Sequence, residues 1–384
     1  MTEPAASKPD TATFKEGLED IVATSSSICL VDGIKGRLLY RGYDIVELAE
    51  KSEFSEVAFL LWHGRLPSKA EYEQFRAGFR NSIELPDETV EILKLFPKAA
   101  TPMEVLRTAV SSLGHWDPDS GNTAFDASLR KAIRLTTRIG AIVTAHEHIR
   151  QGREPIPPKA GENVAYNFLY GLTGKEPPSD FVDALDVSLI LHADHELNAS
   201  TFAARVTAAT LSDMYSSVTS GIGALKGPLH GGANEQVMRV LKEIGDPSRA
   251  ESYVRDALSR KVKLPGFGHR VYRTEDPRAT VLRRWSEKLG KLVGDSKWYE
   301  ISREVERVVR QNTKVYPNVD FYSASTYHVM GIPTELFTPL FAVSRIVGWT
   351  AHILEQWGHN RLIRPRAHYT GAVDLSYVAI DQRG

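Results

Sequence analysis

The chain has 384 residues, of which 42% are hydrophobic, 25% charged and 9% aromatic. Lys and Arg number 47 against 48 Asp and Glu, which gives a net charge of -1. This balance argues against a protein that binds nucleic acid or a membrane surface, because such proteins carry an excess of positive charge. The length exceeds that of most single domains and favours two.

No segment suggests export or membrane insertion. The first fifteen or so residues are polar, rich in alanine and contain acids, which is not typical of a signal peptide. The longest apolar stretch, 337–354, is interrupted by Arg345 and His352, which argues against a membrane span. The single cysteine, Cys29, excludes an internal disulfide and a cysteine-built metal site. We therefore expect a cytoplasmic protein with neither a membrane nor a nucleic-acid partner.

The first predicted element is a small β-hairpin, with strands at 28–31 and 37–40 and a turn that contains Asp32-Gly33. After it, apolar residues recur three and four positions apart, which is typical of helices. The pattern predicts helices over 53–64, 68–80, 101–114, 122–151, 178–197, 199–220, 231–244, 248–261, 294–312 and 335–357. Strands and helices do not alternate, so the fold class is all-α rather than α/β.

The predicted helix 178–197 carries polar groups on its apolar stripe. His192, His195 and Glu196 continue this stripe at helical spacing. Polar groups on an inward face belong either to a satisfied core network or to a site. A metal site on His192, Asp194 and His195, as in a helical metal-dependent phosphohydrolase, is the weaker alternative. The order is not His-Glu-x-x-His, and no acidic cluster completes a coordination shell.

Glycines surround two further histidines. His230 lies in Gly227-Pro-Leu-His-Gly-Gly, ahead of a helix that we expect Asn234 to cap. The positive end of that helix would keep the imidazole neutral, although a glycine turn with an incidental histidine is the alternative. His269 follows Gly266 and Gly268.

His269 also lies in a basic stretch. Between Arg260 and Arg284 eight Lys or Arg stand against two acids. This excess predicts attraction of a small polyanion, with a solvated basic helix face as the alternative. The glycines do not form a dinucleotide fingerprint, because the third glycine and a preceding strand are missing.

An acid and two arginines complete the candidates. Asp320 lies just before an expected helix start, where desolvation would raise its pKa and the helix terminus would oppose the shift; a plain helix cap is the alternative. Arg345 lies inside an apolar helix and requires a carboxylate from the protein or from a substrate. Arg364 follows that helix in Arg-Pro-Arg.

In content and order these motifs resemble the citrate synthase family. The segments that carry the resemblance are Tyr-Arg-Gly-Tyr-Asp at 40–44, Leu-His-Ala-Asp-His-Glu at 191–196, Gly-Pro-Leu-His-Gly at 227–231, Gly-Phe-Gly-His-Arg-Val-Tyr at 266–272, Asp-Pro-Arg at 276–278, Pro-Asn-Val-Asp at 317–320, Ser-Arg at 344–345 and Arg-Pro-Arg at 364–366. The resemblance runs from about residue 15 to the end.

The resemblance implies a two-domain helical fold with a small N-terminal β-hairpin, assembled as a homodimer. The large, dimer-forming domain would comprise residues 1–231 and 336–384, and the small, mobile, CoA-binding domain residues 232–335. The implied activity is the condensation of acetyl-CoA with oxaloacetate and the hydrolysis of citryl-CoA to citrate and CoA, the first step of the tricarboxylic acid cycle. Acetyl-CoA is then a substrate, and neither a cofactor nor a metal is expected.

The resemblance also assigns roles. Asp320 would remove a methyl proton from acetyl-CoA, His230 would hydrogen-bond the thioester oxygen, and His269 would act as an acid toward the oxaloacetate carbonyl. Oxaloacetate would be held by His195, Arg278, Arg345 and, from the neighbouring subunit, Arg364. Contacts with CoA are assigned to Lys263, Leu264, Gly266, Phe267, Gly268 and Lys314.

Two further readings stay open. A 2-methylcitrate synthase, which uses propionyl-CoA, shares these motifs, and an apolar pocket discriminates one methylene by only about 1–3 kcal/mol. A non-catalytic helical scaffold is the other alternative, but it would not explain why the three loops that carry His230, His269 and Asp320 all match one active site.

Overall fold

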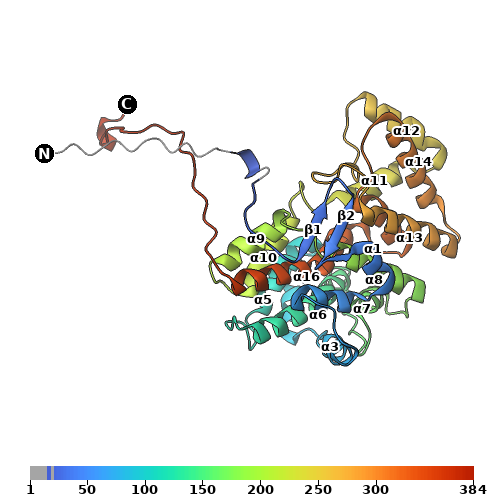
Figure 1. Cartoon of the computed structure of the whole chain (residues 1–384), viewed down its shortest axis with the longest axis horizontal. Helices are drawn as coiled ribbons and strands as arrows, with labels where there is room; N and C mark the ends of the chain where they lie inside the picture. Colours follow the sequence, from blue (N-terminus) through green and yellow to red (C-terminus); the bar gives the residue numbers. More distant parts are fainter. Residues whose placement is uncertain (1–14, 19–20) are drawn as a thin grey trace.

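The computed structural model describes residues 15–18 and 21–384, and in this part of the chain helices dominate (Figure 1). They are α1 (Ile45–Lys51), α2 (Phe54–His63), α3 (Lys69–Asn81), α4 (Asp87–Leu95), α5 (Pro102–Leu113), α6 (Phe125–Arg150), α7 (Val164–Thr173), α8 (Ser179–His192), α9 (Ala199–Ala209), α10 (Met214–Leu225), α11 (Ala233–Ile244), α12 (Pro247–Ser259), α13 (Pro277–Val293), α14 (Lys297–Asn312), α15 (Val319–Val329) and α16 (Phe337–Gly358). The predicted all-α class is confirmed.

One small antiparallel sheet precedes the helices. Its strands, in the order β1-β2-β3, are β1 (Cys29–Asp32), β2 (Arg37–Tyr40) and β3 (Tyr43–Asp44). Cys29 pairs with Tyr40 and Asp32 with Arg37, so the turn occupies residues 33–36. The predicted hairpin is confirmed, and the short strand β3 is added to it.

The predicted helix 199–220 is wrong as a single helix. The chain leaves the helical conformation after Ala209, and Leu211 adopts a φ of 63°. Asp213 then caps α10, because its carboxylate accepts a hydrogen bond from the N–H of Ser216. A short polar side chain that caps a helix outweighs the continuous apolar periodicity here.

The predicted helix 178–197 is too long. Helix α8 ends at His192, and the following turn is held by the Asp194 carboxylate, which accepts a hydrogen bond from the N–H of Glu196. Glu196 has a φ of 55° and is exposed, so it does not continue the apolar stripe. His195 therefore lies in a loop past the helix end. Helices α1, α4, α7 and α13 were not predicted.

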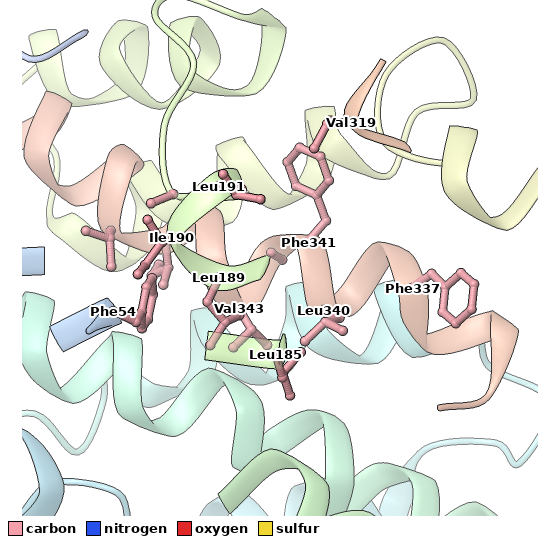
Figure 2. Close-up of a cluster of buried hydrophobic side chains, with 14 of the residues drawn as sticks. Phe54, Leu185, Leu189, Ile190, Leu191, Val319, Phe337, Leu340, Phe341 and Val343 are labelled. Atoms are coloured by element: carbon pink, nitrogen blue, oxygen red, sulfur yellow. The ribbon is translucent and has the colours of Figure 1, made fainter. Parts of the chain in front are cut away.

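Helix α16 is the centre of the larger part of the molecule. Its residues 337–353 are buried, and it packs against α2, α6, α8, α9 and α10. Figure 2 shows Leu185 and Leu189 of α8 beside Leu340 and Val343 of α16. The site residues at the end of α8 and within α16 are thus carried on a closely packed core.

Helices α11 to α15 form a second group, at the upper right of Figure 1. Within it α12 packs on α14, and α15 packs on α11, α13 and α14. Helix α13 also contacts α1 and α8 of the larger group. The division at 232–335 and the mobility of the smaller part stay predictions.

The chain after α16 is an extended tail that runs away from the helical body (Figure 1). It exposes large apolar side chains, namely Leu362, Tyr369, Val373, Leu375, Tyr377 and Ile380. Among the described helices, none is long and apolar enough to span a membrane.

Candidate active site

Asp276 joins the two helices that carry Arg278 and Asp320. Its carboxylate caps α13, pairs with the Arg278 guanidinium at 2.8 Å, and accepts a hydrogen bond from the N–H of Val319 at 3.2 Å. Asp276 and Arg278 are both buried. The buried, hydrogen-bonded ion pair therefore fixes the starts of α13 and α15 next to each other.

The loop before His269 is hydrogen-bonded to the segment before Asp320. Asn318 donates its backbone N–H to the Gly266 carbonyl oxygen and its side-chain N–H to that of Gly268. Gly266 has a φ of 78°, and a Cβ there would lie 2.7 Å from Val237 Cγ2, so only glycine fits. These contacts bring His269 and Asp320 to one site. Asn318, not Asp320, caps α15.

The tautomer of His230 is set by helix α9. The backbone N–H of Ser200 donates to Nε2 at 3.3 Å, and the Ser200 hydroxyl lies 2.8 Å from the same nitrogen. Trp349 of α16 donates its indole N–H to that hydroxyl. Because Nε2 accepts a hydrogen bond, the neutral ring carries its proton on Nδ1.

His269 has the opposite tautomer. Its Nδ1 accepts hydrogen bonds from the backbone N–H groups of Val271 at 3.0 Å and Tyr272 at 3.2 Å, so Nε2 carries the proton. The ring of His195 lies 5.1 Å from that of His269, and His195 Nε2 lies 3.3 Å from the Tyr272 hydroxyl. Among the residues that the structure describes, neither the Nδ1–H of His230 nor the Nε2–H of His269 has a hydrogen-bond partner, so each can donate to a ligand.

Burial keeps these histidines neutral. It lowers the pKa of His230 to about 4, with a further decrease from Arg345, and that of His269 to about 4, with a further decrease from Arg278. The predicted neutrality of His230 is confirmed, but burial and Arg345 cause it rather than the helix terminus. Gly232, not Asn234, caps α11.

The pKa of the Asp320 carboxyl is shifted upward rather than downward. Burial raises the pKa of its carboxyl to about 6, Arg278 and Arg345 oppose the shift, and Asp276 supports it. The expected increase by desolvation is confirmed. A carboxylate with a pKa near 6 is available as a base at neutral pH and is more basic than an exposed one.

Arg345 is a buried cation that forms no ion pair in the described part of the chain, although the charge of the Asp194 carboxylate favours it. Its Nε donates to the His192 carbonyl oxygen at 2.8 Å, and its guanidinium lies 4.7 Å from the centre of the Phe341 ring. Burial lowers the pKa of this guanidinium. Such a group requires an anion. Its positive charge also lowers the pKa values of His195, His230 and Asp320.

Only some of the residues expected to contact CoA lie close to one another. Gly268, His269 and Lys314 line one cavity of about 190 Å³. Phe267 packs on Phe321, with ring centres 4.5 Å apart. Lys263 is exposed and Leu264 is half-buried. A role of any of these residues in CoA binding stays a prediction.

Arg364 lies apart from this site. It is exposed on the tail and lines a separate hollow of about 760 Å³ with Ser25, Ser27 and Arg205. Within residues 15–18 and 21–384, no hydrogen bond or ion pair joins Arg364 to the other residues expected at oxaloacetate.

The metal alternative finds no support in the geometry of its three residues. His192 donates Nδ1–H to the Ser188 carbonyl oxygen, Asp194 lies against His352, and His195 faces Tyr272. Among the described residues, no group of His, Cys, Asp and Glu has the arrangement of a metal site.

Comparisons with known proteins identify the family of this chain. The family model described as citrate synthase, C-terminal domain, matches residues 17–366. This chain belongs to the citrate synthase family. Citrate synthase 2 of Bacillus subtilis is 51% identical over 372 residues, which cover 97% of this chain and 100% of that protein. The 2-methylcitrate synthase of Shewanella oneidensis is 42% identical, over 91% of this chain and 93% of its own.

A solved citrate synthase has the same fold. It is the ternary complex of carboxymethyl coenzyme A and oxaloacetate with the enzyme of Thermoplasma acidophilum, which has a TM-score of 0.89 and is 34% identical. The match covers 97% of this chain and 100% of that one. The resemblance of the motifs to the citrate synthase family is thereby confirmed, as is the expectation of an acyltransferase.

Three supporting residues had not been expected from the sequence. Ser200 and Trp349 fix His230, and Asp276 holds Arg278. Asp276 had a detectable signal, because Asp-Pro-Arg is typical of an N-cap followed by proline at the first helical position. Ser200 and Trp349 had none, since 149 positions separate them.

The pKa values predict the acidic limb of the pH profile of this citrate synthase family member. The base form of Asp320 requires deprotonation, so kcat/KM for acetyl-CoA should rise about tenfold per pH unit up to about pH 6 and then level off. His230 and His269, with pKa values of about 4, are mostly neutral around the expected inflection at pH 6. The release of CoA thiol at constant ionic strength measures the profile. A profile without an inflection near pH 6 would contradict the assignment of the base to Asp320.

Proposed function

We propose that this protein condenses acetyl-CoA with oxaloacetate and hydrolyses the resulting citryl-CoA to citrate and CoA. The observation that carries the proposal is the set of proton-handling groups at the site. Two neutral histidines each offer one N–H, and a carboxylate with a pKa of about 6 lies beside two buried guanidinium groups. This set suits an enolate reaction of a thioester with a dianion.

The first step is the removal of a methyl proton from acetyl-CoA by Asp320. A thioester α-proton is a weak acid, so the developing oxyanion needs a preorganised donor. His230 supplies this donor through Nδ1–H, and one such hydrogen bond contributes roughly 3–4 kcal/mol. A neutral imidazole is available for this role because burial and Arg345 disfavour its charged form.

The second step forms the carbon–carbon bond. The enolate carbon attacks the ketone carbon of oxaloacetate, and the Nε2–H of His269 donates to the carbonyl oxygen as it gains charge. Arg278, Arg345 and His195 hold the two carboxylates, for which planar guanidinium groups are well suited. Water then cleaves the thioester and releases CoA and citrate. No cofactor or metal takes part in this proposal.

The carboxymethyl coenzyme A and oxaloacetate of the Thermoplasma acidophilum complex support this choice of substrates. We place CoA beside the loop 263–268 and Lys314, and we assign the chain to the cytoplasm, where a single free thiol at Cys29 is compatible with reducing conditions.

A second candidate is a 2-methylcitrate synthase, which the relatives with that name favour. The purified protein should therefore be assayed for CoA thiol release with oxaloacetate and either acetyl-CoA or propionyl-CoA. We expect a higher kcat/KM for acetyl-CoA. A higher value for propionyl-CoA would move the assignment to 2-methylcitrate synthase, and no release from either would contradict both.

We further propose a homodimer in which Arg364 completes the neighbouring site. The exposed apolar side chains of the tail would be covered by a second copy of the chain, since large apolar patches mark interaction surfaces. In the single chain Arg364 is remote from the buried pair Arg278 and Asp276, which fits a role in the partner's site.

Mixing of two inactive variants tests this arrangement. Arg364→Ala and His230→Ala homodimers should each lose most activity with little change in fold. In a mixed dimer, one site has both its own His230 and the partner's Arg364. Random reassociation should therefore restore about one quarter of wild-type activity, because about half of the dimers are mixed and each has one intact site. If Arg364 acts within its own chain, mixing restores nothing.

A further inference from the structure

The tip of the N-terminal hairpin touches the loop that follows His269. The N–H of Arg273 donates to the carbonyl oxygen of Gly33 at 2.9 Å. A Cβ at Gly33 would lie 2.1 Å from the Val271 carbonyl oxygen, and a Cβ at Gly36 would lie 2.7 Å from Thr274 Cγ2. Two backbone segments more than 230 positions apart are thus in direct contact, with no room for a side chain at Gly33.

The peptide unit that meets Gly33 is also the one that orients His269. The carbonyl of Val271 and the N–H of Tyr272 belong to the same planar peptide group. Its oxygen lies against Gly33, and its N–H donates to His269 Nδ1 at 3.2 Å. If the hairpin displaces this peptide group, the hydrogen bond from its N–H to His269 Nδ1, which helps to set the tautomer of His269, changes as well.

We propose that Gly33 is a positioning residue for His269, through the Val271–Tyr272 peptide group. The proposal rests on the role of His269 as the acid toward oxaloacetate. In this proposal the hairpin tip does not contact the substrate. It supports the loop whose two backbone N–H groups donate to Nδ1 of His269. These hydrogen bonds keep the proton of His269 on Nε2, where it can be donated to the oxaloacetate carbonyl.

The hairpin can serve as a support because its base is anchored. Leu38 and Tyr40 are fully buried, and the Tyr40 hydroxyl donates to the Asp194 carbonyl oxygen at 2.9 Å and accepts from its N–H at 3.0 Å. The loop is the weaker partner, because Val271 is 39% exposed and Arg273 is exposed. Added bulk at Gly33 should therefore displace the loop and not the hairpin.

The same anchor links the hairpin to the two segments that carry His195 and His269. Asp194, which Tyr40 holds, directly precedes His195, while Gly33 supports the loop after His269. The hairpin belongs to the larger group of helices and the loop to the smaller. By contacting both parts, the hairpin sets the distance between His195 and His269, whose rings lie 5.1 Å apart.

Gly33→Ala tests the contact. Gly33 has no positive φ, so alanine meets the Val271 carbonyl without backbone strain of its own. We expect kcat of condensation to fall about 10- to 100-fold, since a displacement of about 1 Å at a reacting group has this effect. The thermal midpoint should change little. Ile34→Ala, at a neighbouring tip residue that is 85% exposed, is the matched control and should behave as wild type.

A partial reaction separates positioning from a merely structural role. Exchange of the acetyl-CoA methyl protons with solvent, in the presence of a dicarboxylate that lacks the ketone, uses Asp320 and His230 but not His269. We expect Gly33→Ala to retain this exchange while condensation slows. Equal loss of both reactions, or unchanged condensation, would overturn the proposal. His269→Ala, assayed in parallel, tests the role of His269 itself: full condensation there would refute the proposed function of that residue instead.

A second variant pair probes the contact if Gly33→Ala fails to fold. Arg273→Pro removes the N–H that donates to Gly33, whereas Arg273→Ala keeps it and sets the baseline for loss of the side chain. We expect a lower kcat for the proline variant than for the alanine variant, with proton exchange equal in both. Equal kcat in the two variants would overturn the proposal.

Discussion

The site depends on two buried guanidinium groups, only one of which is neutralised by an ion pair with a carboxylate. Arg278 forms an ion pair with Asp276, while Arg345 hydrogen-bonds a carbonyl oxygen, lies over an aromatic ring and has Asp194 as a nearby charge but forms no ion pair with it in the described chain. A buried cation without an ion-pair partner is costly, and the core of α8 and α16 holds it in place. The free protein therefore contains a site for an anion before any substrate binds, and a dianion satisfies it best.

The same two charges set the protonation of the groups around them. Together with burial they keep His230 and His269 neutral, and at Asp320 they oppose the rise in pKa that burial causes. The result is a base with a pKa of about 6 between two neutral donors. Proton removal, oxyanion stabilisation and protonation of the ketone can thus proceed at one pH, without a strong acid or base.

Much of this could be predicted from the sequence, because short-range patterns carry it. Apolar periodicity predicted most of the helices, and glycines beside His230 and His269 marked the loops of the site. The end of α8 at His192 and the break at Leu211 could not be predicted, since Asp194 and Asp213 hold these turns through hydrogen bonds that outweigh periodicity. The contact of Gly33 with Val271 and that of Trp349 with Ser200 arise only when distant segments pack together.

The most direct measurement compares Arg345→Met with Arg278→Met by calorimetric titration with oxaloacetate and by thermal unfolding without ligand. Loss of either guanidinium should weaken oxaloacetate binding by about 30-fold or more. The free Arg345→Met protein should unfold within a few degrees of wild type, because Asp194, the carboxylate whose charge favours Arg345, keeps its contact with His352. Arg278→Met leaves Asp276 unpaired and should be destabilised by about 3–5 kcal/mol. If Arg345→Met bound oxaloacetate normally, or lost as much stability as Arg278→Met, the claim that Arg345 is a cation reserved for the substrate would be contradicted.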